Sequence, residues 1–268
     1  MTRRFLPLAL LLSFGSGVAL LGSPHSRAAE PAQKVVRVGF VGPSSPSTAV
    51  RGVAGFWERL RELGWVEGEN LVIEERWAEG QYNRLPALMA EVIERKVDVI
   101  VTYGTVAAIA AKNATSTIPI VDAAMGDPIG IGLATSLARP GGNLTGLSMG
   151  WVDGIGGKWL EMLQEIVPRL TTVAAIMNLD NPVERDLANE LETIASARHL
   201  KLRIVGAGDA DAVDRALEQA RQQAQAFVVS ADPIIGRKRR QITEFAQPAE
   251  FVHPTDYFTV KAAYCPAL

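Results

Sequence analysis

The chain contains few of the side chains from which metal centres and nucleophilic catalytic sites are usually built. Among its 268 residues there is one cysteine, Cys265, and there are three histidines. One cysteine cannot form an internal disulfide framework, and it excludes a zinc site built from several cysteines. Neither Gly-x-Gly-x-x-Gly nor Gly-x-x-x-x-Gly-Lys-Ser/Thr occurs, so nothing supports a dinucleotide site or a P-loop. We therefore expect a protein that is not an enzyme and that holds no metal and no cofactor.

The composition also lacks an excess of charge of one sign. Lysine and arginine number 27 and aspartate and glutamate 29, for a net charge of −2. No global basic field therefore draws the chain to nucleic acid. Hydrophobic residues make up 48% and charged residues 21%, which is typical of a folded globular chain. The length allows one large domain or two lobes of about 100–150 residues each.

The one long apolar stretch lies at the N-terminus. Two arginines precede an apolar run over residues 5–21, and Ser26 and Ala28 stand at the −3 and −1 positions of a cleavage point. This order is typical of a secretory signal over residues 1–28. An uncleaved membrane anchor is the alternative, although the run is short for a span and is interrupted by proline and glycine. The paired arginines leave both the general secretory and the twin-arginine route open. Export of a chain without disulfides favours a periplasmic location.

From residue 35 onward, short β-branched runs alternate with amphipathic stretches. This alternation predicts parallel sheets covered by helices on both faces. We expect strands at residues 35–41, 70–77, 97–102, 118–123, 143–148, 171–177, 200–205 and 226–230. We expect helices at residues 49–63, 83–95, 105–113, 127–138, 158–167, 182–198, 209–223 and 234–245. A glycine-rich stretch at 150–157 predicts a boundary between an N-terminal lobe, 35–150, and a C-terminal lobe, 151–246.

Ligands of such sheets bind beyond the carboxyl ends of the strands, so the loops that follow the strands hold the candidate binding residues. Those candidates are Ser44, Ser45, Gly104, Thr105, Asp127, Asn178 and Asp232.

Five of these candidates also have a plain structural alternative. The helix start at Gly104 and Thr105 favours an anion through its free N–H groups, or it is an ordinary cap. Asp127 either caps the helix expected after it or pairs with a ligand ammonium. Asn178 and Asp232 are turn formers or hydrogen-bonding ligands.

The five tryptophans carry little evidence for aromatic recognition. Trp57 and Trp159 lie on expected helix faces and are predicted to be core residues, whereas Trp151 lies in the expected hinge and is a candidate for the cleft wall.

Several segments resemble one known family, the substrate-binding proteins of ABC transporters of the tryptophan/tyrosine type. The resemblance covers about residues 35–246, and its most specific part is the long segment that ends in Ser-Leu-Ala-Arg-Pro-Gly-Gly-Asn-Leu-Thr-Gly. The segments that carry it are residues 60–70, 74–80, 97–102, 118–121, 126–133, 136–146, 178–182 and 231–233.

The resemblance implies two Rossmann-like lobes of the type I periplasmic-binding-protein fold, which close on a small solute by a hinge motion. It implies delivery of that solute to a membrane permease driven by a separate ATPase, and it leaves the solute open. We expect the binding protein to be a monomer. If the solute is an amino acid, the helix start at Thr105 suits its carboxylate and Asp127 suits its ammonium.

Residues 247–268 depart from the family pattern. Three prolines in a short segment suit neither a helix nor a central strand. We expect a truncation or frameshift near residue 246, an incomplete second lobe and an atypical tail. A sensory module of the same fold and a non-functional truncated paralogue are the alternatives to a working transport protein.

Overall fold

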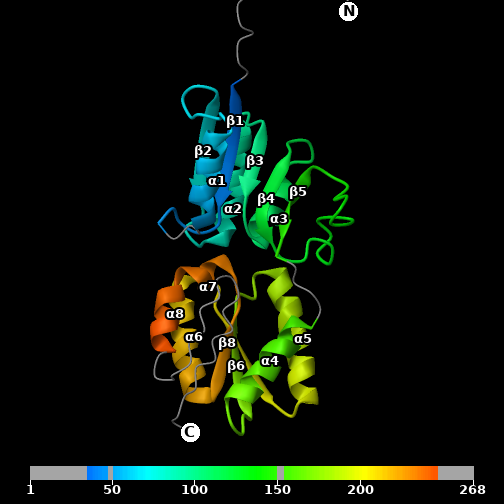
Figure 1. Ribbon diagram of the computed structural model, residues 1–268, viewed down its shortest axis with the longest axis vertical. Coiled ribbons are helices and arrows are strands. Elements are labelled where there is room, and N and C mark those ends of the chain that lie inside the picture. The colour runs from blue at the N-terminus through cyan, green and yellow to red at the C-terminus, as the bar shows by residue number, and fades with distance from the viewer. Residues whose placement is uncertain (1–34, 48–50, 150–153, 247–268) are drawn as a thin grey trace, which may run out of the picture. The chain divides into compact units, whose positions relative to one another are not determined.

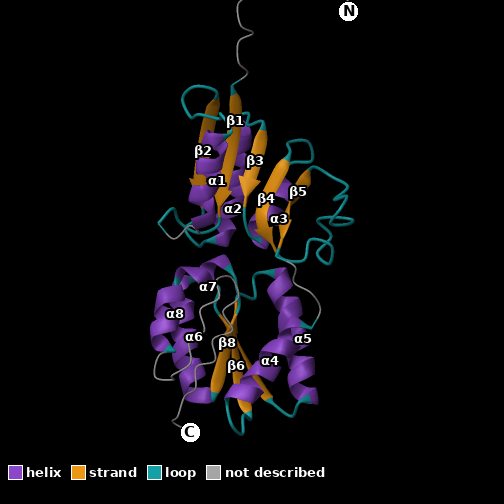
Figure 2. Cartoon of the chain, viewed as in Figure 1, coloured by secondary structure: helices purple, strands orange, loops and turns teal. Residues whose placement is uncertain are grey.

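Two parallel sheets organise the computed structural model, which describes residues 35–47, 51–149 and 154–246 (Figures 1 and 2). The first lobe is built on a five-stranded sheet with the order β2-β1-β3-β4-β5. Its strands are β1 (Val36–Gly42), β2 (Leu71–Trp77), β3 (Val99–Thr102), β4 (Ile120–Met125) and β5 (Leu144–Ser148). The second lobe is built on a three-stranded sheet with the order β7-β6-β8. Its strands are β6 (Thr172–Met177), β7 (Lys201–Gly206) and β8 (Ala226–Val229).

Helices join the successive strands of each sheet, except that a series of turns joins β4 to β5. The first lobe contains α1 (Arg51–Glu62), the short 3₁₀ helix η1 (Tyr82–Arg84), α2 (Leu85–Glu94) and α3 (Thr105–Ala114). The second lobe contains α4 (Ile155–Ile166), α5 (Pro182–Ala197), α6 (Ala210–Gln223), α7 (Pro233–Arg237) and α8 (Arg239–Phe245). The alternation predicted from the sequence is therefore confirmed, with five strands in the first sheet and three in the second.

Helices cover both faces of each sheet, which explains why the central strands are almost continuously apolar. In the first lobe, α2 and the alanine-rich α3 pack on one face, and α1 packs on the other through Phe56, Trp57 and Leu60. In the second lobe, α4 and α5 pack on one face and α6 and α8 on the other (Figure 1). Trp159 of α4 is buried in this core, as predicted, and Trp57 packs against the core of the first lobe. Trp151 lies outside the described residues.

The helix predicted over residues 127–138 is wrong. The chain forms a series of turns there, because Pro128, Gly130 and Gly132 lower its helix propensity and Gly132 has a φ of +73°. Polar side chains also bond the backbone locally: Asp127 Oδ1 accepts from the N–H of Ile129 at 3.1 Å. Such local bonds compete with a helix, so Asp127 is a turn residue and not a helix cap.

The helix predicted over residues 234–245 is two helices, α7 and α8, which meet at Lys238. Gly236 weakens helix propensity just before this break. The Nζ of Lys238 lies 2.9 Å from Oδ2 of Asp214 on α6, and this ion pair anchors the junction.

Side-chain caps fix the starts of three second-lobe helices, α5, α6 and α7. Oδ1 of Asp209 accepts from the N–H of Ala212 at 2.6 Å and caps α6. We expect Asp209→Ala to lower the free energy of unfolding by about 1 kcal/mol, because one N–H of the first turn loses its acceptor. Urea unfolding measures this loss. Arg215→Ala, an exposed change in the same helix, is the control and should cost less than about 0.5 kcal/mol. An equal loss in both variants would contradict the capping role.

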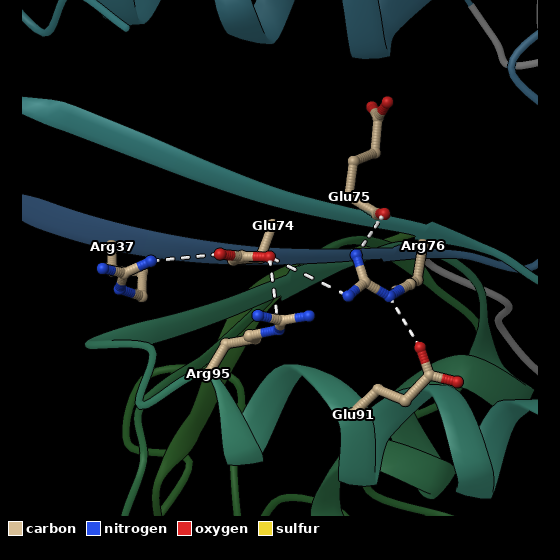
Figure 3. Close-up of polar contacts among 6 residues, drawn as sticks. All are labelled: Arg37, Glu74, Glu75, Arg76, Glu91 and Arg95. Carbon is tan, nitrogen blue, oxygen red and sulfur yellow. Dashed lines mark hydrogen bonds and ion pairs between the residues drawn. The ribbon is translucent and has the colours of Figure 1, made fainter. Parts of the chain in front are cut away.

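A cluster of charged side chains lines the edge strand β2 (Figure 3). The carboxylate of Glu74 lies 3.0 Å from Arg37, 3.8 Å from Arg76 and 4.0 Å from Arg95. Arg76 also reaches Glu91 of α2 at 2.7 Å. Each such partly exposed pair contributes only about 0–1 kcal/mol. Charges on an edge strand do, however, discourage pairing with the edge of another sheet.

None of the helices within the described parts of the chain has the length and the apolar character that a membrane crossing demands.

Candidate functional site

The loops that follow the strands hold the residues predicted for the site, except Thr105, which is the first residue of α3. The loop after β1 buries Ser44 and Ser45, and the hydroxyls of Ser44 and Tyr103 share a hydrogen bond. Burial raises the pKa of the Tyr103 phenol, so this phenol stays protonated at neutral pH. Ser44 therefore serves the architecture of the first lobe through its hydroxyl, and Ser45 is the next residue of the loop after β1.

The turn between β3 and α3 forms the second part of the site. Gly104 precedes α3 with a φ of +85°, a conformation that favours glycine. A Cβ on Gly104 would lie 3.1 Å from Cγ of Pro233, so the start of α3 lies against the start of α7 in the second lobe. Oγ1 of Thr105 accepts from the N–H of Gly126 at 2.9 Å and ties this turn to the loop after β4. The first N–H groups of α3 have no acceptor within the helix and can meet an anion there.

The centre of the site is the carboxylate of Asp232, which follows β8 and is 2% exposed. Its Oδ1 accepts from the phenol of Tyr82 at 2.8 Å, the amide of Asn178 at 3.2 Å and the N–H of Ile234 at 2.9 Å. Its Oδ2 accepts from the amide of Asn181 at 3.2 Å. Asn178 and Asp232, which lie 54 positions apart in the sequence, are therefore brought together as the carboxyl ends of β6 and β8 converge.

A second buried carboxyl, Glu184 on α5, lies behind Asp232. It is 1% exposed, and its Oε2 accepts from the N–H of Asn178 and the hydroxyl of Ser230, both at 2.6 Å. Burial, and next the charge of Asp232, raise the pKa of Glu184 well above its ordinary value. Burial also raises the pKa of Asp232, while the N–H of Ile234, Tyr82 and the two asparagines oppose that rise. The four donors favour the ionised form of Asp232, so Glu184 is the carboxyl that keeps a proton.

The candidate residues predicted from the sequence do not include Glu184, Asn181 or Tyr82. Asn181 is the N-cap of α5 and Glu184 follows it by three residues, which is the spacing of a capping box. That spacing is a signal for a polar residue in the first turn of a helix, but the burial of the Glu184 carboxyl depends on Ser230 and Asp232 of another segment. Tyr82 comes from the other lobe, 150 positions from Asp232, so no local pattern connects them.

A comparison with protein families identifies the family of the chain. Residues 40–252 match the family described as ABC transporter substrate binding protein. The chain belongs to this family.

Individual relatives of this substrate-binding protein agree with that assignment. Over 182 residues it is 27% identical to a tyrosine-binding protein of Clostridioides difficile strain R20291, which covers 68% of this chain and 52% of the relative. The chain thus spans about half the length of that curated relative.

The ABC domain from Streptococcus pneumonia solved in complex with L-Trp superposes with a TM-score of 0.66 at 21% identity, over 80% of this chain and 72% of that one. A conserved domain protein from Vibrio cholerae superposes with a TM-score of 0.68 at 24% identity and the same coverage. These structures confirm the predicted type I periplasmic-binding-protein fold, with a second lobe that is partial in the described residues.

Asp127 of this substrate-binding protein lies in the loop after β4, beside Gly126. A Cβ on Gly126 would lie 3.0 Å from Cγ1 of Val183 in α5, so this loop also approaches the second lobe. Among the hydrogen bonds of the described residues, however, none joins Asp127 to the cluster around Asp232. The structure thus brings Gly104, Asn178 and Asp232 into neighbouring loops, with Asp127 in the loop that Thr105 anchors.

One segment of the substrate-binding protein has the spacing of a hydrolase nucleophile. Residues 146–150 read Gly-Leu-Ser-Met-Gly, but Ser148 ends β5 and its Oγ donates to the carbonyl of Gly126 at 3.0 Å. A nucleophile elbow requires a strand that turns directly into a helix, whereas α4 begins only at Ile155. The family and the fold are those of substrate-binding proteins, and this serine lacks the structural context of a catalytic one.

Proposed function

We propose that the protein is the extracytoplasmic solute-binding component of an ABC importer. It acts as a monomer in the periplasm after removal of residues 1–28, and it delivers a small solute to a membrane permease. The observation that carries the proposal is the buried carboxylate of Asp232, which lies where the loops of two lobes meet. Membership of the substrate-binding family supports it.

We further propose that the solute is an amino acid. The start of α3 at Gly104 and Thr105 suits a carboxylate, because free N–H groups and the helix dipole favour an anion there. Among the hydrogen bonds of the described residues, Oδ2 of Asp232 accepts only from Asn181, so it retains lone-pair capacity for an ammonium. Asp232 with Asn178 is therefore a stronger ammonium site than Asp127. The names of two relatives, a tyrosine-binding protein and a protein solved with L-Trp, support an aromatic amino acid.

Thermal unfolding with a panel of amino acids tests this proposal. A solute present at 100 times its Kd should stabilise the protein by about 2.7 kcal/mol. For a chain of this size, that corresponds to a rise in Tm of roughly 5–11 °C. Asp232→Asn should abolish the rise because the ammonium loses its counter-charge, whereas Asp127→Asn should leave it in place.

The outcomes separate the alternatives. If the rise in Tm persists in Asp232→Asn but is lost in Asp127→Asn, Asp127 binds the ammonium instead of Asp232. A cooperative transition that no amino acid shifts would exclude the amino acids of the panel as solutes. A broad transition without cooperativity would favour a non-functional paralogue.

A further inference from the structure

Two hydrogen bonds join the lobes through the two ends of α7. At its start, Oδ1 of Asp232 accepts from the phenol of Tyr82 at 2.8 Å. At its end, Nη1 of Arg237 donates to the backbone carbonyl of Glu79 at 2.6 Å. Tyr82 and Glu79 both belong to the turn after β2 in the first lobe. One short helix of the second lobe is thus held at both ends by one turn of the first.

The bond from Tyr82 is the stronger type of hydrogen bond. Its acceptor is a carboxylate buried to 2% exposure, and bonds to an ionised group are about twice as strong as neutral ones. Burial, and next the charge of Asp232, raise the pKa of Tyr82 well above its ordinary value. The phenol therefore remains a donor at all physiological pH values.

Close packing beside these bonds shows that the lobes meet without intervening space at two further points. A Cβ on Gly104 would lie 3.1 Å from Pro233, and a Cβ on Gly126 would lie 3.0 Å from Val183. Both glycines belong to the first lobe and both neighbours to the second. All of these contacts form between residues of the chain itself.

We propose that Tyr82 is a positioning residue that latches the two lobes together. It acts through Asp232, and the contact of Arg237 with Glu79 supports it. Because the latch occupies Oδ1 and leaves capacity on Oδ2, it persists when a ligand binds at Oδ2. The inference goes beyond the proposed transport function, since it concerns the residues that hold the two lobes together and requires no particular solute.

Distances between spin labels in the two lobes test the latch. Cysteine replaces two exposed residues, Glu94 at the end of α2 and Glu192 on α5, and Cys265→Ser removes the native thiol. Spin labels are attached to the two new cysteines. The distance between them is measured by pulsed electron–electron double resonance without added solute. We expect one short distance in the otherwise unchanged protein. In Tyr82→Phe the ratio of closed to open molecules should fall about 10- to 100-fold, and a longer distance should appear.

Two matched controls distinguish loss of a bond between the lobes from loss of a bond within one lobe. Tyr103→Phe removes a phenol that bonds Ser44 within the first lobe, and it should leave the distance unchanged. Arg237→Gln should lengthen the distance, whereas Arg185→Gln, which removes a 2.6 Å bond to the carbonyl of Leu179 within the second lobe, should not. Urea unfolding of each variant reports stability separately from closure.

The partner of the latch is tested by adding Asp232→Asn to Tyr82→Phe. The two changes together should open the lobes no further than Asp232→Asn alone, because both remove one interaction. A long distance in the unchanged protein, or an equal opening in Tyr103→Phe, would overturn the proposal. If Tyr82→Phe does not fold, an unchanged distance in Arg237→Gln would overturn it instead.

Discussion

Asp122→Asn is expected to raise the free energy of unfolding by up to about 4 kcal/mol at pH 8. Asp122 lies on β4 and is fully buried, and its Oδ2 has no hydrogen-bond partner within the described residues. Its Oδ1 accepts from the N–H of Ala124 at 2.9 Å. Burial raises the pKa of this carboxyl from 3.8 to about 7.

The direction of the effect follows from proton uptake on folding. The folded carboxyl keeps its proton up to about pH 7, while the unfolded one loses it near pH 3.8. Folding therefore binds a proton between these values, and the free energy of unfolding falls as the pH rises through that window. The difference of about three pH units corresponds to about 4 kcal/mol. Asparagine cannot ionise, so the free energy of unfolding of the variant does not fall as the pH rises through this window.

Thermal unfolding at pH 5 and pH 8 measures the difference. At pH 8 the Tm of Asp122→Asn should exceed that of the unchanged protein by roughly 8–16 °C, and the gap should shrink at pH 5. An asparagine resembles the protonated acid, since Oδ1 still accepts from Ala124 and the second polar atom stays unpaired. Asp186→Asn, an exposed change on α5, controls for the loss of one charge. A gap that does not depend on pH would contradict the buried ionisation.

Glu184→Ala is expected to destabilise the protein by about 3 kcal/mol. The N–H of Asn178 and the hydroxyl of Ser230 both lose their acceptor in a buried place, and each unsatisfied group costs about 1–3 kcal/mol. Urea unfolding at pH 7 measures the loss.

Glu184→Gln is the matched variant, because glutamine has nearly the shape of the protonated acid. The raised pKa of Glu184 means that the unchanged protein loses stability as the pH rises above the ordinary value of 4.5. We expect Glu184→Gln to be within about 1 kcal/mol of the unchanged protein at pH 5 and more stable than it at pH 9. A glutamine variant as unstable as the alanine variant at all pH values would show that Glu184 is ionised.

Much of the fold could be predicted because periodicity and end signals agree over most segments. The β-branched run in β1 and the alanine-rich α3 both have one obvious interpretation, and Gly64 has a φ of +86° where the end of a helix was expected. The segment at 127–138 misled because Ile129, Leu133 and Leu137 have helical spacing. In the structure Leu137 is 65% exposed and Ile129 46% exposed, so that spacing does not mark a buried face.

The sequence predicts which loops form the candidate site, because sheet topology determines which loops lie together. The rule that ligands bind beyond the carboxyl ends of parallel strands located Gly104, Asn178 and Asp232 in neighbouring loops. It could not supply Tyr82 or the burial of Glu184, because these depend on contacts between segments that share no local pattern. Whether the predicted residues bind a solute remains a prediction.

The separation of the strand pairings into two sheets sets the order in which this chain can fold. Each strand pairing within the described residues joins segments of the same lobe, whereas the bond between Tyr82 and Asp232 spans 150 positions. Contacts of long sequence separation carry the largest loop-closure cost and form late. During synthesis all five strands of the first lobe leave the ribosome before Asp232 is made. We therefore expect the first lobe to collapse before the two lobes join.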